Sequence, residues 1–215
     1  MVLVLGGVAG CSSGDAGAGA SVPQYSADDD GSGGGASAGA SGAASGSAAP
    51  TALTWAPQDV TPEGLSNPDT EYTVVSIPDG LDDAGKEVVA AYVAYDRSTW
   101  EAYRVMDGDL SRVEASTTGA ELEVYKSSYE SYQTNGWHME GQYSMTVQGV
   151  KISDAKGDEA SLVVLNDHRG SRTVTDSGED AGRDNRHSYM TSVRLRKVSG
   201  VWMVDSSDGV GVVDQ

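Results

Sequence analysis

The feature that most limits what this chain can fold into is a run of twenty residues, GSGGGASAGASGAASGSAAP, at positions 31–50. From Ser12 to Pro50 the sequence consists almost entirely of Gly, Ala, Ser and Asp. Such a segment cannot bury enough apolar surface to offset the entropy lost on ordering, so it should be a flexible coil. Its glycines do not make a phosphate-binding loop, because no strand precedes them and no helix follows. Roughly 140 residues then remain for one domain with a real core.

A single cysteine stands in front of this segment. Cys11 cannot form an intrachain disulfide, and no histidine lies near it to complete a metal site. The residues Val8-Ala9-Gly10 precede it, and Val2–Leu5 has the character of the end of an apolar signal-peptide region. An aliphatic residue, two small residues and a cysteine resemble a bacterial lipobox. The resemblance implies cleavage by signal peptidase II and a diacylglycerol on Cys11, whose two acyl chains would anchor the chain stably.

The beginning of the sequence departs from that pattern in one respect. No Lys or Arg precedes Cys11, and the apolar run is shorter than the roughly 7–15 residues expected. We therefore interpret residues 1–10 as a partial signal peptide, with the start assigned late or the true beginning missing. The alternative is an incidental thiol beside an apolar N-terminus. With the lipobox interpretation, the protein is expected on the extracytoplasmic face of the cell membrane.

Charge supports a division between tail and domain. The formal net charge is −18, and the first basic residue is Lys86. Nucleic-acid binding needs a basic stripe, and the sequence has none, so nucleic acid is not an expected partner. No later segment approaches the roughly 20 apolar residues of a membrane span. The expected organisation is a lipidated cysteine and disordered tether at 11–50, a proline-containing transition at 51–80 and a folded domain at 81–215.

The transition segment contains four of the chain's prolines. They forbid a long helix there, while residues 72–75 could add a short edge strand. The prolines are Pro57, Pro62, Pro68 and Pro78.

Two helices are predicted at the start of the domain. Asp79, Asp82 and Asp83 suit the positive end of a first helix that runs to about Asp107. Its apolar face is Val88, Tyr92, Tyr95, Thr99, Tyr103 and Met106. A helical turn is expected over Leu110–Ala115. Thr118-Gly119-Ala120-Glu121 is a capping-box signature for a second helix, which Asn135-Gly136 closes. The inner stripe of that helix is Leu122, Tyr125, Tyr129 and Tyr132.

From residue 137 the hydrophobic period changes to two, which predicts strands. Gln148-Gly149 should form a bulge, and EASLVVL at 159–165 should be a central strand because it is apolar on both faces. A weaker strand is expected at 172–175 and a long one at 186–198. Ser199-Gly200 should turn the long strand into a last one, with Trp202 and Val204 facing the core. Helices followed by an antiparallel sheet predict an α+β domain.

The long first helix, the helix end NGWHMEG and the hairpin RLRKVSGVWMVDS resemble the nuclear transport factor 2-like superfamily. They look most like its small secreted or lipid-anchored members in high-GC Gram-positive bacteria. The resemblance covers about Leu81 to Ser207, and its specific parts are Gly136-Trp137 and the Gly200-Val201-Trp202 hairpin. It implies a curved antiparallel sheet wrapped around a helix, which forms a cone with a pocket at its open end. It also implies a possible homodimer through the outer sheet face.

Enzymes on this cone, such as ketosteroid isomerase and scytalone dehydratase, place Asp, His or Tyr inside the pocket. This sequence offers His138, His168 and His187, but no pair has the spacing of a metal site or an acid–base dyad. We interpret all three as ordinary surface or structural histidines. The segment DSGEDAGRDN at 176–185 fails the calcium-loop pattern, since Ala181 stands where glycine is needed. No catalytic residue, metal or cofactor is predicted.

The aromatic residues are the weak candidates for a pocket lining. The chain has no Phe, so Tyr and Trp must supply the bulky part of the core. They could line the pocket or fill it, and we favour filling for most, with Tyr103 and Tyr189 as the best pocket candidates. The residues concerned are Tyr92, Tyr95, Tyr103, Trp137, Tyr143 and Tyr189.

Two functions are compatible with these patterns. The preferred one is a non-enzymatic, lipid-anchored envelope protein that binds another envelope protein, a cell-wall component or a small ligand. The alternative is a small isomerase, dehydratase or cyclase on the same fold. Two ionisable side chains converging in an open pocket would favour the enzyme, and the sequence shows no such convergence.

Overall fold

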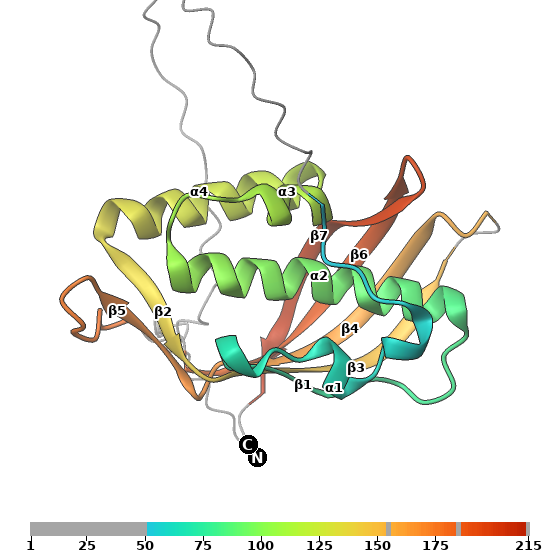
Figure 1. Ribbon diagram of the computed structural model, residues 1–215, viewed down its shortest axis with the longest axis horizontal. Coiled ribbons are helices and arrows are strands. Elements are labelled where there is room, and N and C mark those ends of the chain that lie inside the picture. Colours follow the sequence, from blue (N-terminus) through green and yellow to red (C-terminus); the bar gives the residue numbers. More distant parts are fainter. Residues whose placement is uncertain (1–50, 154–155, 184–185, 214–215) are drawn as a thin grey trace, which may run out of the picture. The chain divides into compact units, whose positions relative to one another are not determined.

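The computed structural model describes residues 51–153, 156–183 and 186–213 (Figure 1). The predictions for residues 1–50, including lipidation of Cys11, the signal peptide and the tether, lie outside this part of the chain. The described residues form helices packed on one face of a curved, mostly antiparallel sheet, so the prediction of an α+β domain is confirmed. None of the described helices combines the length and apolar character needed to span a membrane.

The main sheet has five strands in the order β1-β3-β4-β6-β7. All neighbours are antiparallel except β1 and β3, which are parallel. The central strand is β4, as the apolar run at 159–165 predicted. The strands are β1 (Tyr72–Ser76), β3 (Tyr143–Ile152), β4 (Glu159–Asp167), β6 (Ser188–Val198) and β7 (Val201–Val212).

A second, two-stranded sheet pairs β2 (Trp137–Gly141) with β5 (Ser171–Thr175). It continues the main sheet, because β2 leads into β3 and β4 into β5 within a few residues. The chain bends at Gly141 and Gly170, where the backbones come very close. A Cβ on Gly141 would lie 2.3 Å from the carbonyl oxygen of Gly170, and Gly141 has a φ of +85°. Only glycine fits this bend, which turns β2 toward helices α2 (Asp83–Val105) and α4 (Gly119–Asn135).

Helix α2 begins and ends as its sequence predicted. The Asp82 side chain accepts a hydrogen bond from the Gly85 N–H at 2.8 Å, and Met106 closes the helix in the left-handed conformation. Its buried surface is wider than the predicted face, because Val89, Val93 and Trp100 are buried as well. The helix is covered by the sheet on one side and by the segment before β1 and helix α3 (Ser111–Ser116) on others.

Helix α4 ends at Gly136, which has the predicted left-handed conformation. The predicted capping box at its start is wrong. The Thr118 side chain makes no capping hydrogen bond, and Glu121 instead accepts hydrogen bonds from the Tyr95 hydroxyl at 2.6 Å and the Ser207 N–H at 2.9 Å. Glu121 is therefore engaged by tertiary partners from α2 and β7 and not by the backbone N–H of Thr118, as a capping box would require.

The proline-containing segment is part of the folded unit, which differs from the expected boundary between residues 80 and 81. Three of its prolines start short helices, and the segment between and after these helices packs against the core. Val60, Leu65, Tyr72 and Val74 are buried in the main core. The helices are η1 (Pro57–Asp59), α1 (Pro62–Leu65) and η2 (Pro68–Thr70).

The edge strand predicted at 72–75 is confirmed as β1. Its outer edge is covered by the chain itself, since Tyr72 exchanges backbone hydrogen bonds with Asn67 and the Val74 N–H donates to the Ser66 hydroxyl. The edge strand is therefore protected from pairing with another chain.

The last hairpin has the predicted register. Trp202 and Val204 are 7% and 0% exposed, whereas Val201 is 54% exposed. The bulge predicted in β3 also forms, as a register shift between Val147 and Gly149.

Candidate functional site

The structure separates the six predicted pocket aromatics into three groups. Tyr92 and Tyr143 contact Asp96, a residue that the sequence analysis did not select, and Tyr189 joins this group through His168. Tyr95 hydrogen-bonds to Glu121, and Tyr103 and Trp137 pack around Tyr132. The group around Asp96 contains the most polar contacts, and we take it as the candidate site.

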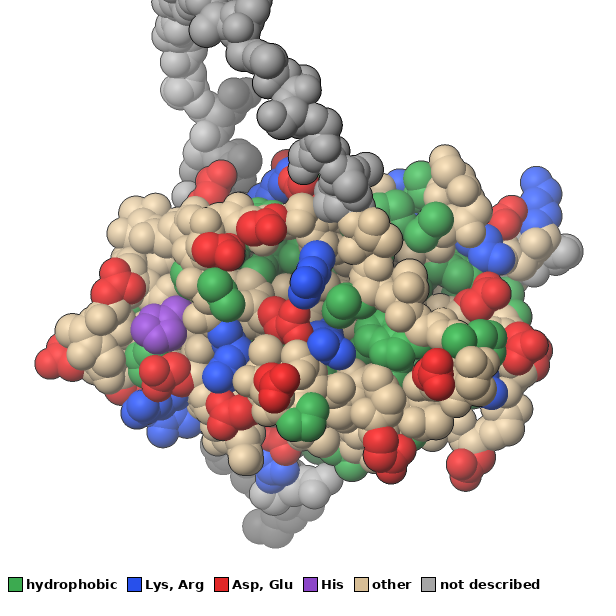
Figure 2. Space-filling view, in the orientation of Figure 1, with side chains coloured by type: hydrophobic (Ala, Val, Ile, Leu, Met, Phe, Trp, Pro, Cys, Tyr) green, Lys and Arg blue, Asp and Glu red, His purple; other side chains and the backbone are tan. Residues whose placement is uncertain are grey.

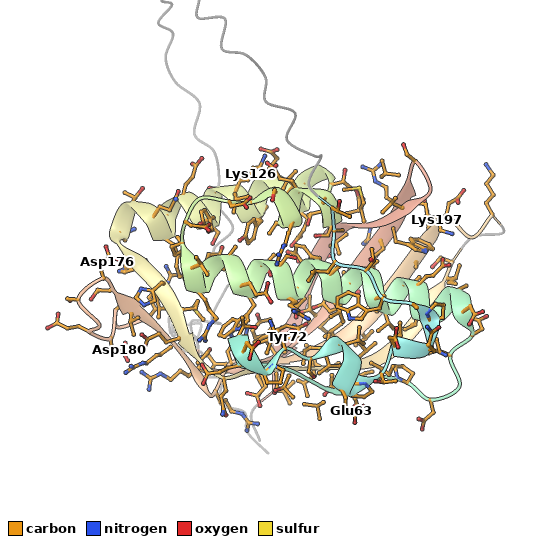
Figure 3. All side chains as sticks on the ribbon, in the orientation of Figure 1. Glu63, Tyr72, Lys126, Asp176, Asp180 and Lys197 are labelled. Carbon is orange, nitrogen blue, oxygen red and sulfur yellow. The ribbon has the colours of Figure 1, made fainter. Side chains whose placement is uncertain are left out.

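The centre of the site is a carboxylate held by three tyrosine hydroxyls. Asp96 lies one helical turn after Tyr92 on α2, so both side chains face the sheet. Tyr72 and Tyr143 begin β1 and β3 and are direct partners in the parallel pair. The hydroxyls of Tyr72 and Tyr143 lie 2.8 and 2.9 Å from Asp96 Oδ2, and that of Tyr92 lies 3.3 Å from Oδ1. Figure 3 shows Tyr72 in the layer between α2 and the sheet.

Two strand residues extend the network below the tyrosines. Asn166 Oδ1, on β4, accepts from the Tyr143 hydroxyl at 2.8 Å and lies 3.4 Å from the Tyr92 hydroxyl. Its amide donates to the Thr191 hydroxyl on β6 at 2.9 Å. Three tyrosine protons thus serve three acceptor oxygens, two on Asp96 and one on Asn166. The network is complete when Asp96 is ionised.

The charge of Asp96 is poorly compensated. Among the described residues it has no ion pair, and burial raises the pKa of its carboxyl to about 6, although hydrogen bonds from the tyrosines oppose that rise. Burial also raises the pKa of Tyr72, Tyr92 and Tyr143 well above its usual value, so these hydroxyls stay protonated. Asp96 keeps some solvent exposure, which moderates the penalty for its charge. The site can take up or release one proton near pH 6.

Aromatic rings close the site on one side. Trp100 stacks on Tyr143 with centroids 5.2 Å apart, and its indole N–H donates to the Thr70 carbonyl. His168, in the turn between β4 and β5, meets Tyr143 edge-on at 4.6 Å and lies 3.0 Å from the Tyr189 hydroxyl through Nε2. Burial lowers the pKa of His168 to about 4, so its ring is neutral at pH 7. It is a structural histidine within the site's wall.

The other aromatic groups have different surroundings. Tyr103 contacts the rings of Tyr125, Tyr129 and Tyr132, under α4. Trp137 meets Tyr132 edge-on at 5.8 Å. Arg183 lies over both rings of that pair, 5.0 Å from the Trp137 centroid. These contacts are those of packed side chains.

The two other histidines have different surroundings. His138 is half-buried on β2, 3.5 Å from Glu140, and the backbone carbonyl of His187 accepts from the His168 N–H. The described part of the chain contains no group of three or more His, Cys, Asp or Glu side chains placed to hold a metal ion.

None of the six predicted aromatics lines either of two hollows on the described surface. The larger, about 420 Å³ and wide open, is bordered by Asp180, Gly182, Arg183 and Arg186. The smaller, about 220 Å³, lies between α2 and α3. Figure 3 shows Asp180 at the far end of the two-stranded sheet, away from Tyr72.

Sequence reasoning missed Asp96, Tyr72, Trp100 and Asn166. One signal could have found Asp96: it follows Tyr92 by four residues, so it extends the predicted apolar face of α2 with a carboxylate. An acidic residue at such a position needs buried partners. Two of its partners, Tyr72 and Tyr143, come from strands β1 and β3, and their convergence on α2 has no local signature.

No family model matches the sequence, and no curated protein matches it. Among solved structures, the chain is similar to the intermembrane space region of the chloroplast protein ARC6, with 12% sequence identity and a TM-score of 0.48, over 62% of this chain and 99% of that one. It is also similar to a de novo designed protein with a curved β-sheet, with 16% identity and a TM-score of 0.22, over 41% and 62% of the two chains. Neither likeness carries an argument about function.

Proposed function

We propose that this chain is a lipid-anchored cell-envelope protein whose folded unit is a nuclear transport factor 2-like binding module on the extracytoplasmic face of the membrane. The anchor is supported by Val8-Ala9-Gly10-Cys11 and by the Gly-, Ala- and Ser-rich segment that follows. The cone is supported by the bend at Gly141 and Gly170 and by the contacts of β2 with α2 and α4.

The observation that carries a binding role is the way the interior of the fold is filled. Every acceptor oxygen of Asp96 is engaged by a tyrosine hydroxyl, and the rings of Trp100 and His168 pack against Tyr143. A catalytic carboxylate must instead reach a substrate. A module filled in this way offers its outer surface to a partner. On the face shown in Figure 2, acidic and basic side chains are interspersed with scattered apolar ones.

The anchor is tested by labelling. The chain, expressed with a complete signal peptide in a bacterium that processes lipoproteins, should incorporate a fatty-acid analogue and sediment with membranes. The matched variant Cys11→Ser should lose both label and sedimentation. Equal labelling of the two proteins would contradict the anchor.

The binding role is tested on the same cells. Crosslinking on intact cells, followed by identification of the captured molecule, should give an envelope protein or a cell-wall component from the wild type. A soluble chain lacking the lipid should still bind that molecule in vitro. Loss of binding by the soluble chain would mean that the anchor, and not the folded unit, makes the contact.

A small isomerase, dehydratase or cyclase is the second candidate, and one observation favours it. Asp96 has a pKa of about 6 and some solvent exposure, so it could exchange a proton near neutral pH. Assays on a panel of substrates for these reactions test this function with wild type and Asp96→Asn. Turnover that disappears in Asp96→Asn would favour the enzyme, and turnover that persists would exclude this site as its source.

A further inference from the structure

The hollow between α2 and α3 is a second place where charged groups gather, apart from the Asp96 site. Its volume is about 220 Å³, room for on the order of seven waters at roughly 30 Å³ each, so it suits a small molecule. Part of its wall is apolar, from Ala102, Val105 and Val113. Its charged side chains are Glu101, Asp107, Asp109 and Arg112.

One of the three carboxylates is fully engaged with protein. Glu101 Oε1 accepts from Arg97 Nε at 2.8 Å and from Asn67 Nδ2 at 2.7 Å, and Oε2 accepts from Arg112 Nη1 at 3.2 Å. Its side chain is only 15% exposed. Glu101 therefore fixes the wall of the hollow and orients Arg112, and it offers nothing further to a ligand.

The other two carboxylates lie just beyond the end of α2. Asp107 Oδ1 accepts from the Asp109 N–H at 2.9 Å, and Asp107 Oδ2 has no donor among the described residues. Asp109 Oδ1 accepts from the Ser111 N–H, and the hydrogen bonds from Ser111 lower the pKa of its carboxyl. The C-terminus of a long helix carries partial negative charge. This end of the hollow favours a positive group.

The opposite charge is supplied by Arg112 on α3. Its side chain is 57% exposed, and its contact with Glu101 uses one of the five N–H donors of a guanidinium. Its other donors have no carboxylate partner in the described part of the chain. They are available to an anion, which a guanidinium binds in bidentate fashion.

A buried hydroxyl is also left without a partner in this wall. Ser98 is 3% exposed, lines the hollow, and its Oγ has no hydrogen-bond partner among the described residues. A buried polar group without a partner costs free energy. Binding would therefore be favoured if the wall moved so that a polar atom of the bound molecule reached Ser98 Oγ.

We propose that this hollow binds a small zwitterion, namely an amino acid or short peptide with a free amine and a free carboxylate. The ammonium group lies at Asp107 and Asp109, and the carboxylate lies at Arg112. A purely anionic ligand would face three carboxylates, and a bare cation would face the guanidinium, so a ligand with both charges fits best. The inference goes beyond the proposed function, since it assigns a site and a ligand class, and it does not depend on the anchor.

The test is a titration of the ¹⁵N-labelled chain followed by backbone amide shifts. With alanyl-alanine as probe, shifts should be confined to residues 98–113, with a Kd on the order of 1 mM. N-acetyl-alanyl-alanine lacks the ammonium group, and alanyl-alanine amide lacks the carboxylate. Each should bind roughly tenfold more weakly or not at all.

Matched variants assign each charge to its residue. Arg112→Gln lacks the partner of the carboxylate, so it should bind alanyl-alanine as weakly as the wild type binds alanyl-alanine amide. Asp107→Asn lacks a partner of the ammonium group, so it should bind alanyl-alanine as weakly as the wild type binds the acetylated probe. Asn at 107 keeps the oxygen that accepts from Asp109. Arg194→Gln, at an arginine on β6 with 71% exposure, is the control and should bind like wild type.

Three results would overturn the proposal. They are shifts absent or spread over the whole surface, a blocked probe that binds as tightly as alanyl-alanine, and a loss in Arg194→Gln equal to that in Arg112→Gln. Because the readout is binding by the soluble chain, none of these results bears on lipidation of Cys11.

Discussion

Two tyrosine-rich regions lie along α2, one around Asp96 and one under α4, and they use the same side chain differently. Around Asp96, the hydroxyls of Tyr72, Tyr92 and Tyr143 all donate to a carboxylate. Beneath α4, the rings of Tyr103, Tyr125 and Tyr129 pack on one another, and the Tyr125 hydroxyl is buried with no partner in the described structure. The first region is held by hydrogen bonds to a charge, whereas the second is held by ring contacts.

The difference shows that a buried tyrosine does not by itself indicate a polar site. What matters is whether its hydroxyl has an acceptor, because an engaged hydroxyl stabilises the fold and an unpartnered buried one costs free energy. Four substitutions test this comparison.

Trp202→Ala should have the largest effect on the free energy of unfolding. It shows how much stability is lost when a whole core side chain is removed, for comparison with the loss of single hydroxyls. Trp202 is 7% exposed on the inner face of β7. Its removal should lower the free energy of unfolding by about 3–5 kcal/mol, measured by urea denaturation. Val201→Ala, at an exposed position next to it, is the control. A loss within about 0.5 kcal/mol for Trp202→Ala would contradict its place in the core.

Tyr143→Phe should have the second largest effect, because it removes the one hydroxyl proton that Asp96 and Asn166 share. Hydrogen bonds to charged groups are worth roughly 1.5–3 kcal/mol, and we expect a destabilisation of about 2–3 kcal/mol at pH 7. The loss should be smaller at pH 4, where Asp96 is protonated. An equal loss at both pH values would show that the ring, and not the hydrogen bond to the charge, was affected.

Asp96→Asn should change how stability depends on pH. The pKa of Asp96 is raised to about 6 in the folded protein from 3.8, so folding favours the protonated carboxyl. Its stabilisation is fully present below about pH 4 and is lost as pH rises through 6. Two pKa units correspond to about 3 kcal/mol, which partial exposure reduces to about 2 kcal/mol.

The measurement is the free energy of unfolding of wild type, Asp96→Asn and Asp208→Asn at pH 4 and pH 8. Asp208 is 70% exposed, and its variant controls for the general effect of removing one negative charge from an acidic chain. When the pH is raised from 4 to 8, the free energy of unfolding of Asp96→Asn should fall by about 2 kcal/mol less than that of the control. Identical pH profiles for the two variants would refute the raised pKa.

Tyr125→Phe should have the smallest effect, within about 0.5 kcal/mol of wild type or slightly stabilising. The substitution removes a buried hydroxyl that has no partner and leaves the ring contacts with Tyr103 and Tyr129 in place. The pair Tyr143→Phe and Tyr125→Phe is therefore the direct comparison of the two regions. A loss as large as that of Tyr143→Phe would mean that the Tyr125 hydroxyl has an acceptor.

The sequence alone determined the elements whose causes are local. The ends of α2 and α4 follow from Asp82 and Gly136, the bulge in β3 from Gln148-Gly149, and the inward register of Trp202 from the two-residue period after a tight turn. These features depend on neighbours within a few positions, which is why residue patterns predict them.

The tertiary structure decided how each polar side chain is used, because its partners lie far away in the chain. Tyr72 and Tyr143 reach Asp96 from 24 and 47 positions away, and burial in the packed core raises the pKa of Asp96 although their hydrogen bonds lower it. Glu121 has the spacing of a capping box, but Ser207, 86 positions away, takes its carboxylate. The hydrogen-bond partners and the desolvation of a group are properties of the packed core, and no short stretch of sequence contains them.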